Sequence, residues 1–415
     1  MIVLLVAIAA RLRPGWVLPG LLFVLPWRVP LFGFVELPTL LVLGAAAGRA
    51  PGLVRAAREW PLVGASTLAL VAWIAASSLW ASSASFALAE AAKWSLVGLS
   101  LFVAAADRNA EPPPIVAAVG LGMIPIALWA LAERTHLVAP RGDVDELRAR
   151  LIVLRDLVRG RALFVHPNRL AEFLDQTGVF LAACAAAGPL HRLAAAGVAI
   201  ALGGSWATGS TAGMAALAGG AILTLAGLSV ASLRRTGHRA GARGRWLAGG
   251  ALLAAAVVGG AAATLAYREH GGLASRRFVY RFAIGLIQEH PILGLGGGNW
   301  VLAVAAAPRW MRHNLSFFGP HSHSLVLQLW VELGVIGLAL GVAFFAVPLW
   351  YGVRAFGRLP AAWRGVEAGA IAGVTALLAH NLVSYFLTQP ANGIAPGLLL
   401  GLALRGVVGS DVRRS

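Results

Sequence analysis

Charged residues are scarce in this sequence. Only 12% of its 415 residues are Asp, Glu, Lys or Arg, whereas a soluble domain has roughly a quarter, so the composition argues against a soluble protein. The single cysteine, Cys184, rules out an intrachain disulfide and a Cys-x-x-Cys metal or redox motif. It lies in an alanine-rich apolar run, which is typical of a small buried hydrophobic residue. There is also no Walker-type loop, which excludes a P-loop ATPase.

What the sequence has instead is apolar runs from one end to the other, and 59% of its residues are hydrophobic. A membrane helix needs about twenty mostly apolar residues. The runs therefore predict an all-α integral membrane protein, in which residues 1–415 form a single polytopic membrane domain of about twelve transmembrane helices. The predicted spans are 14–27 (alone or continuous with 2–10), 34–48, 62–80, 86–105, 114–133, 170–188, 193–207, 212–232, 246–266, 324–350, 365–387 and 393–409.

The basic residues recur in short gaps between these runs, and the formal net charge is +17. In a soluble protein that charge would indicate nucleic-acid binding. Here the positive-inside rule explains it, so we expect no nucleic-acid partner. With about twelve spans, the gaps at 49–59, 234–245 and 354–364 and the tail at 413–414 all share one face. We predict that this face is cytoplasmic and that both chain termini lie there.

Two longer gaps fall on the opposite face. We predict a first extracytoplasmic loop at 134–169 and a large, partly helical extracytoplasmic catalytic loop at 267–323, between the ninth and tenth spans. Both loops carry arginines, although the positive-inside rule weighs long loops little. Arginines that remain on the translocated side indicate an anionic ligand.

The second loop contains the clearest chemistry. Its stretch 276–289 has helical character, and Arg277 and Arg281 share one helix face because they are four residues apart. Arg276 points about 100° away from them. Planar guanidinium groups bind phosphate oxygens in pairs and stay charged, which suits a diphosphate leaving group. The alternative is that these arginines pair with lipid headgroups at the membrane surface.

Histidines follow at the start of the next predicted span. His323 can accept a proton near neutral pH and act as a general base on an acceptor hydroxyl, or it can be an interfacial hydrogen-bonding residue. His321 and His313 are possible supporting residues. The three histidines match no usual zinc-ligand spacing, so we expect no metal. The glycines at 294–298 follow a helical stretch, so they predict a turn that lets backbone approach a ligand or a neighbouring helix, not a dinucleotide site.

Residues 276–296 read R-x3-Y-x10-P-x2-G-x-G, and residues 321–338 read HSHSLVLQLWVELGVIGL. Together they resemble the O-antigen ligase and O-antigen polymerase superfamily. LFVHPNRLAEFL, residues 163–174, is similar to a further element of that superfamily. The resemblance implies a bacterial inner (plasma) membrane protein that transfers a glycan from an undecaprenyl-diphosphate donor to a lipid-core or glycan acceptor. Transfer would invert the anomeric carbon and need no metal or other cofactor.

The resemblance also assigns roles to residues. It implies that Arg276 binds the diphosphate and that His323 is the catalytic histidine. Arg169 becomes a third basic contact, or it only anchors the start of its span. Many members carry Ser-Arg where this chain has Ser210 followed by Thr211. Either Arg169, Arg277 or Arg281 compensates for the missing arginine, or donor binding differs.

A few polar residues lie within or near the ends of predicted spans, where burial in lipid is costly. Glu90 and Lys93 are three apart and are expected to form a structural ion pair. Glu172, near the end of its span, is expected to reach water. His380 and Asn381, deep in the penultimate predicted span, can line an acceptor cavity or hydrogen-bond between helices, and we expect the latter.

The sequence thus predicts a membrane glycosyltransferase of the O-antigen ligase type, acting in cell-surface polysaccharide and lipopolysaccharide biosynthesis in contact with membrane lipids. A repeat-unit polymerase of the same superfamily is the first alternative. A polysaccharide or lipid transporter is the alternative from another class. A transporter is expected to have ionisable groups within the membrane and internal repeats, and this sequence shows no evident sign of either.

Overall fold

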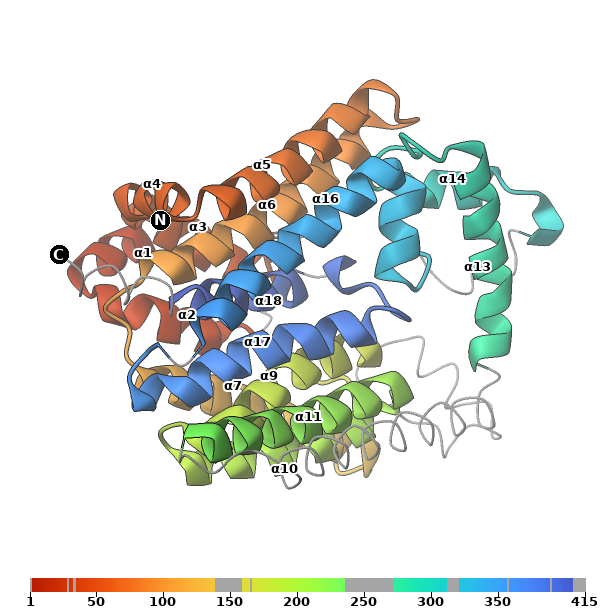
Figure 1. Ribbon diagram of the computed structural model, residues 1–415. Helices are drawn as coiled ribbons and strands as arrows, with labels where there is room; N and C mark the ends of the chain where they lie inside the picture. The colour runs from red at the N-terminus through yellow and green to blue at the C-terminus, as the bar shows by residue number, and fades with distance from the viewer. Residues whose placement is uncertain are drawn as a thin grey trace.

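The computed structural model describes residues 2–27, 30–32, 35–138, 159–164, 166–235, 272–311, 321–356, 358–388 and 390–405. Within these ranges the protein is almost entirely helical (Figure 1). The one exception is a short antiparallel pair, β1 (Pro30–Phe32) and β2 (Val35–Glu36). The predicted all-α class therefore holds, with this small hairpin added.

The α-helices of the described ranges have the following bounds: α1 Ile2–Leu12, α2 Val17–Val24, α3 Leu37–Gly48, α4 Ala50–Glu59, α5 Pro61–Ala76, α6 Ala84–Ala106, α7 Pro112–Arg134, α9 Pro167–Ala187, α10 His191–Thr208, α11 Thr211–Arg235, α13 Gly272–Glu289, α14 Trp300–Ala306, α16 Leu325–Ala355, α17 Arg364–His380 and α18 Pro390–Ala403. Short 3₁₀ turns η1 (Pro14–Trp16), η2 (Ser77–Leu79), η4 (Ala361–Trp363) and η5 (Phe386–Thr388) lie between them.

Six of the described helices are long and apolar enough to cross a membrane, or up to eight if each of two bent helix pairs forms one span. The bent pairs are α1 with η1 and α2, at 118°, and α3 with α4, at 82°. A multi-pass membrane protein is therefore well supported. The count of about twelve stays a prediction, and the predicted span at 246–266 lies outside the described residues.

Helix α9 forms the centre of the bundle. It packs against α17, α10 and α11, and 83% of its 18-residue apolar stretch is buried inside the protein. Small residues allow these close approaches: a Cβ added at Gly369 of α17 would lie 2.6 Å from the Phe180 carbonyl oxygen of α9. Helices α6 and α18 form a second tight pair. The polar start of α9 is thereby held inside the protein.

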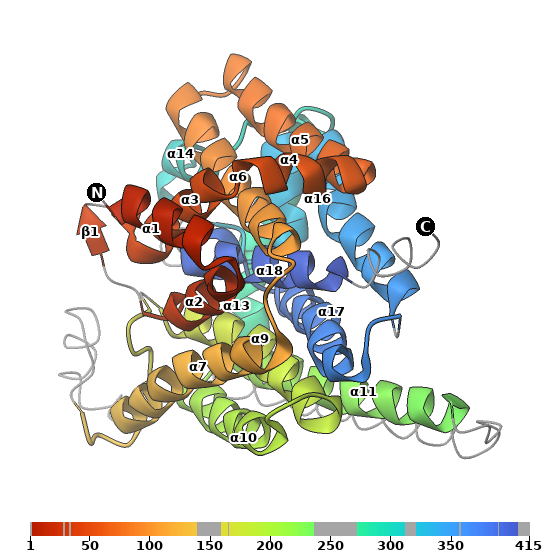
Figure 2. The same cartoon turned by 90° about the vertical axis from the view of Figure 1, so that its left-hand side faces the viewer.

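The two ends of the bundle differ in character. Figure 1 places α4 on the left and α13 and α14 on the right, and the long helices run between them. In Figure 2 the left-hand end faces the viewer, with α3 and α4 toward the front. Helix α4 occupies the basic gap predicted at 49–59, so that gap is a helix with an exposed basic side and not an irregular loop.

The glycine turn at 294–298 docks on a break in α16. Gly334 has φ 67° and ψ −174° inside that helix, and Gly294, Gly296 and Gly298 also have positive φ. The Leu295 amide donates to the Val331 carbonyl at 2.9 Å, and the Gly296 amide donates to the Glu332 carbonyl at 2.7 Å. The predicted backbone approach to a neighbouring helix is therefore confirmed, and the glycine turn and the start of α16 form one contact.

A substitution at Gly334 tests this contact, because only glycine fits at that position. A Cβ at Gly334 would lie 1.8 Å from the Ile292 carbonyl oxygen, in a backbone conformation that other residues avoid. We expect Gly334→Ala to destabilise the fold by about 2 kcal/mol or more. The measurement is the melting temperature of the detergent-solubilised protein.

Gly285→Ala is the matched control. No atom lies within 4 Å of a Cβ added at Gly285, and alanine is the better helix former by about 1 kcal/mol. We expect it to leave the melting temperature unchanged or to raise it. Equal melting temperatures for Gly334→Ala and the wild type would contradict the docking contact.

Candidate functional site

Four parts of the chain that are distant in sequence meet at one end of the bundle. They are the start of α9, the residues 321–324 that precede α16, the turn 381–385 that follows α17, and the first half of α13. Helix α9 begins here because His166 is its N-cap, with Nδ1 accepting from the Asn168 amide at 3.1 Å, and Pro167 occupies the first turn.

Arg169 is the most connected side chain of this region and is only 5% exposed. Its Nη1 donates to Glu172 Oε1 at 2.6 Å and to the Tyr385 carbonyl oxygen. Its Nη2 lies 2.6 Å from Nε2 of His321. A buried guanidinium needs a counter-charge and several acceptors, and these groups supply both.

Glu172 completes this network, and the expectation that it reaches water is wrong. The residue is fully buried. Besides Arg169, its carboxylate accepts from Ser384 Oγ at 2.5 Å and from Asn392 Nδ2 at 2.8 Å. The prediction failed because a short distance from a helix end does not reveal which neighbours cover that end.

Helix α13 brings a second arginine to the same turn. Arg276 Nη1 donates to the Val383 carbonyl oxygen at 2.7 Å, and the Tyr280 hydroxyl donates to the His323 carbonyl oxygen at 3.3 Å. Arg276 and Tyr280 are four residues apart, so they lie on one face of α13. Arg169 and Arg276 thus bind backbone oxygens two residues apart, at Tyr385 and Val383.

Arg277 and Arg281 lie on another face of α13, and both are exposed. The sequence predicted that they share a face and that Arg276 points elsewhere, and the burial pattern agrees. Within the described ranges, no hydrogen bond joins either of these arginines to the 381–385 turn. Their part in diphosphate binding stays a prediction.

His321 is buried, and its protonation state is constrained. Arginine has no acceptor, so Nε2 of His321 accepts from Arg169 and the ring proton of the neutral form is on Nδ1. Among the described residues, that buried Nδ1 has no hydrogen-bond partner. Burial, followed by the charge of Arg169, lowers the pKa of His321 well below its usual 6.5. His321 therefore stays neutral and keeps a buried N–H donor available.

His323 is less buried and its backbone is unusual. Its φ is 56°, a left-handed conformation that non-glycine residues seldom adopt. Its ring centroid lies 4.5 Å from that of His321. Strained backbone of this kind is often found at functional sites. The residue also sits just before α16, whose N-cap Ser324 accepts from the Leu327 amide.

The other polar residues near this site form hydrogen bonds and ion pairs within the helix bundle. Glu90 pairs with Lys93 at 2.8 Å, as predicted, and it also accepts from the Tyr385 hydroxyl at 2.6 Å. His380 Nδ1 lies 2.5 Å from Asp175 Oδ2, which joins α17 to α9 and confirms the expected interhelical hydrogen bond. The expectation that His380 lies deep within a span is wrong, because His380 is the last residue of α17.

Arg159, which the sequence analysis did not single out, lies near Thr211, the position at which many members of the superfamily carry an arginine. Arg159 Nε donates to the Thr208 carbonyl oxygen at 2.5 Å, and its Nη2 donates to Asn168 Oδ1 at 2.5 Å. Gly209 leaves room for it, since a Cβ there would lie 3.2 Å from Arg159 Nε. Arg159 thus packs against the turn that precedes Thr211. It comes from a loop of no distinctive motif, so sequence alone gave no signal.

His313 lies outside the described residues, so its predicted supporting role is not examined by the structure. Within the described ranges, no group of three or more His, Cys, Asp or Glu residues is placed to hold a metal ion. Cys184 is buried and free. The arginine, histidine, tyrosine and backbone groups gathered at this place can bind an anion and transfer a proton.

Residues 196–342 match the family model described as O-antigen ligase. This match supports the resemblance to the O-antigen ligase and polymerase superfamily that the motifs carry. It includes Arg276, Tyr280, His321 and His323, whereas Arg169 and the 381–385 turn lie outside the matched segment. A search of curated proteins gave no match.

The buried His321 predicts a loss of stability in acid. Its pKa is lowered in the folded protein, so the unfolded chain binds the proton more readily and stability falls as the pH drops below about 6.5. We expect His321→Gln to make the fall in melting temperature between pH 7 and pH 5 shallower. His290→Gln, at an exposed histidine, should leave the profile as in the wild type. A profile for His321→Gln as steep as that of the wild type would contradict the assignment.

Proposed function

We propose that the protein is a membrane glycosyltransferase that moves a glycan from an undecaprenyl-diphosphate donor to an acceptor hydroxyl, as an O-antigen ligase would. The family match supports the general activity in polysaccharide biosynthesis. One arrangement supports the chemistry most: guanidinium groups from α9 and α13 meet at the 381–385 turn, and His321 contacts one of them. Cations and imidazoles are thereby gathered at one end of the bundle.

The two arginines would have different roles. Arg169 is neutralised by Glu172 and has both terminal nitrogens engaged, so we assign it to positioning His321 and the turn. Arg276 donates to the Val383 carbonyl and also interacts with the Tyr280 hydroxyl, and no carboxylate pairs with it among the described residues. Its remaining donors suit the diphosphate, on which negative charge develops as the sugar bond breaks. The buried Nδ1–H of His321 can donate to an oxygen of the same ligand.

His323 would act as general base. The acceptor oxygen attacks the anomeric carbon, the bond from that carbon to the diphosphate oxygen breaks, and the diphosphate leaves with the electron pair. The acceptor proton passes to the His323 imidazole. Attack opposite the leaving group inverts the anomeric carbon, and no metal enters this scheme. Positioning and charge stabilisation would lower most of the barrier.

We further propose that 267–323 is the extracytoplasmic catalytic loop, that 134–169 is the first extracytoplasmic loop and that both termini are cytoplasmic. The basic segments support this orientation, because α4 and α13 lie at opposite ends of the long helices in Figure 1. Arg277 and Arg281, on the exposed face of α13, would attract the anionic donor or membrane headgroups.

Replacing Arg276 or His323 by Ala should reduce transfer at least about 100-fold, the lower range for loss of a positioned acid–base group. The reason is loss of diphosphate stabilisation in one variant and of the base in the other. The measurement is product formation by purified protein in nanodiscs that contain a lipid-linked glycan donor and an acceptor, without ATP or added metal.

Arg358→Ala and His290→Ala are the matched controls, because both residues are exposed and neither is part of the site. They should transfer at the wild-type rate. Normal product from Arg276→Ala or His323→Ala, at normal protein level, would remove that residue from the mechanism. Glycan movement across the bilayer without a new glycosidic bond would favour a transporter instead.

A polymerase of the same superfamily would use the same groups. Ligase is the preferred assignment because the matched model is described as O-antigen ligase. Deleting the gene distinguishes them: loss of a ligase leaves long unattached chains on the lipid carrier, whereas loss of a polymerase leaves single repeat units.

A further inference from the structure

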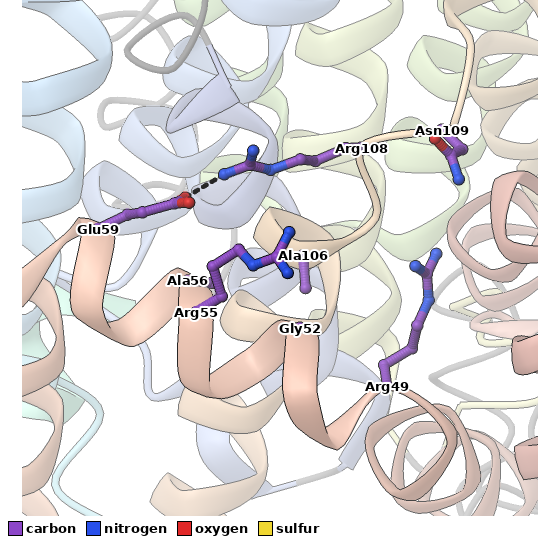
Figure 3. A pocket seen from close by; sticks show the side chains of 8 residues that line it. All are labelled: Arg49, Gly52, Arg55, Ala56, Glu59, Ala106, Arg108 and Asn109. Carbon is purple, nitrogen blue, oxygen red and sulfur yellow. Dashed lines mark hydrogen bonds and ion pairs between the residues drawn. The ribbon is translucent and has the colours of Figure 1, made fainter. Parts of the chain in front are cut away.

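A second basic site lies far from the residues described above. A cavity of about 250 Å³ opens between α4 and the turn that joins α6 to α7. Figure 3 shows Arg49, Arg55 and Arg108 around it, with Glu59 beside Arg108. Gly52 and Ala106 line it with little side-chain bulk, which leaves the space open between the arginines.

The charges around this cavity do not cancel. Glu59 pairs with Arg108, and buried Asp107 accepts from Arg49 Nη2 at 2.5 Å. Asp107 also lies against Arg405, which donates to its carbonyl oxygen. Arg55 lies between Arg49 and Arg108 in Figure 3. No hydrogen bond or ion pair joins Arg55 to another residue in the described ranges, so the cavity has a net positive charge.

Arg49 adds an independent sign of a missing ligand. The side chain of Arg49 is 15% exposed, and its terminal nitrogen Nη2 is bound to Asp107 and to the Pro14 carbonyl. Its Nε, however, is buried and has no hydrogen-bond partner within the part of the chain that the structure describes. Buried polar groups are seldom left without a partner. An acceptor in the cavity would satisfy this donor and compensate Arg55.

The cavity lies beside a helix that is oriented as a membrane-surface helix would be. Helix α4 is bent 82° from α3, and it carries Arg55 and Arg58 on its exposed side, an arrangement typical of a helix that lies along a membrane surface. The cavity and the glycine turn lie at opposite ends of α6. Ala106, the last residue of α6, lines the cavity. Ser83, the N-cap of α6, donates its amide to Asn299, which follows the glycine turn. The 23 residues of α6 span about 34 Å.

We propose that this cavity binds a phosphate group at the membrane surface, on the face predicted to be cytoplasmic. Arg55 and the Nε of Arg49 would donate to the phosphate oxygens, and Arg108 would contribute charge at the rim. Arginine forks suit tetrahedral phosphate oxygens. The phosphate can belong to the headgroup of an anionic phospholipid or be free in solution, and the two sources have the same chemistry in the cavity.

Arg55→Gln is the informative variant, because Arg49 also holds Asp107 and its removal risks the fold. Arg58→Gln is the matched control: it removes the same charge from the same helix, but Arg58 is exposed and does not line the cavity. Loss of a charge-assisted hydrogen bond should weaken binding about tenfold or more. Neither variant should alter glycan transfer, since the cavity is remote from the proposed catalytic residues.

Two probes distinguish the sources. Native mass spectrometry of the full-length protein measures retention of phosphatidylglycerol against phosphatidylcholine, and thermal unfolding measures stabilisation by inorganic phosphate. Selective retention of phosphatidylglycerol that falls about tenfold in Arg55→Gln but not in Arg58→Gln identifies a lipid headgroup. Stabilisation by inorganic phosphate with the same dependence on Arg55 identifies the free anion. Equal loss in both variants, or no response of the wild type to either probe, would overturn the proposal.

Discussion

The buried guanidinium of Arg169 is the constraint on which the site depends. A cation with 5% exposure has to be neutralised and hydrogen-bonded within the protein, since an unpaired buried charge costs several kcal/mol. Glu172 supplies the charge, and His321 and the Tyr385 carbonyl supply acceptors. Because these partners come from three separate segments, satisfying one side chain draws the ends of α9, α16 and α17 together.

This constraint also separates the two arginines by their contacts. Arg169 is committed to internal partners, whereas Arg276 reaches the same turn from α13 with one backbone contact. A group that holds the scaffold rigid and a group that remains able to bind a ligand are both needed for a preorganised anion site. The glycine turn contributes to the same rigidity, because it fixes α13 and its following loop against the break at Gly334. The Tyr280 hydroxyl of α13 also donates to the His323 carbonyl oxygen, just before α16.

Much of the helical framework was predictable, since long apolar runs such as those of α6, α7 and α9 have few alternatives in a membrane. The motif also located Arg276 and His323. The distant partners of Arg169 were not predictable, because Tyr385 is 216 residues away in sequence and no local pattern records such a contact. Helix α4 was missed because its ten residues are too few and too polar to register as a membrane span, although they form an amphipathic helix. Arg159 was missed because only folding places it beside Gly209.

The most direct test of the account is a structure of the full-length protein in lipid nanodiscs with an undecaprenyl-diphosphate-linked glycan bound. We expect the diphosphate oxygens within hydrogen-bond distance of the Arg276 guanidinium, the anomeric carbon facing His323, and the contact between Arg169 and His321 retained. A diphosphate bound on the exposed face of Arg277 and Arg281, with Arg276 still turned to Val383 alone, would contradict it.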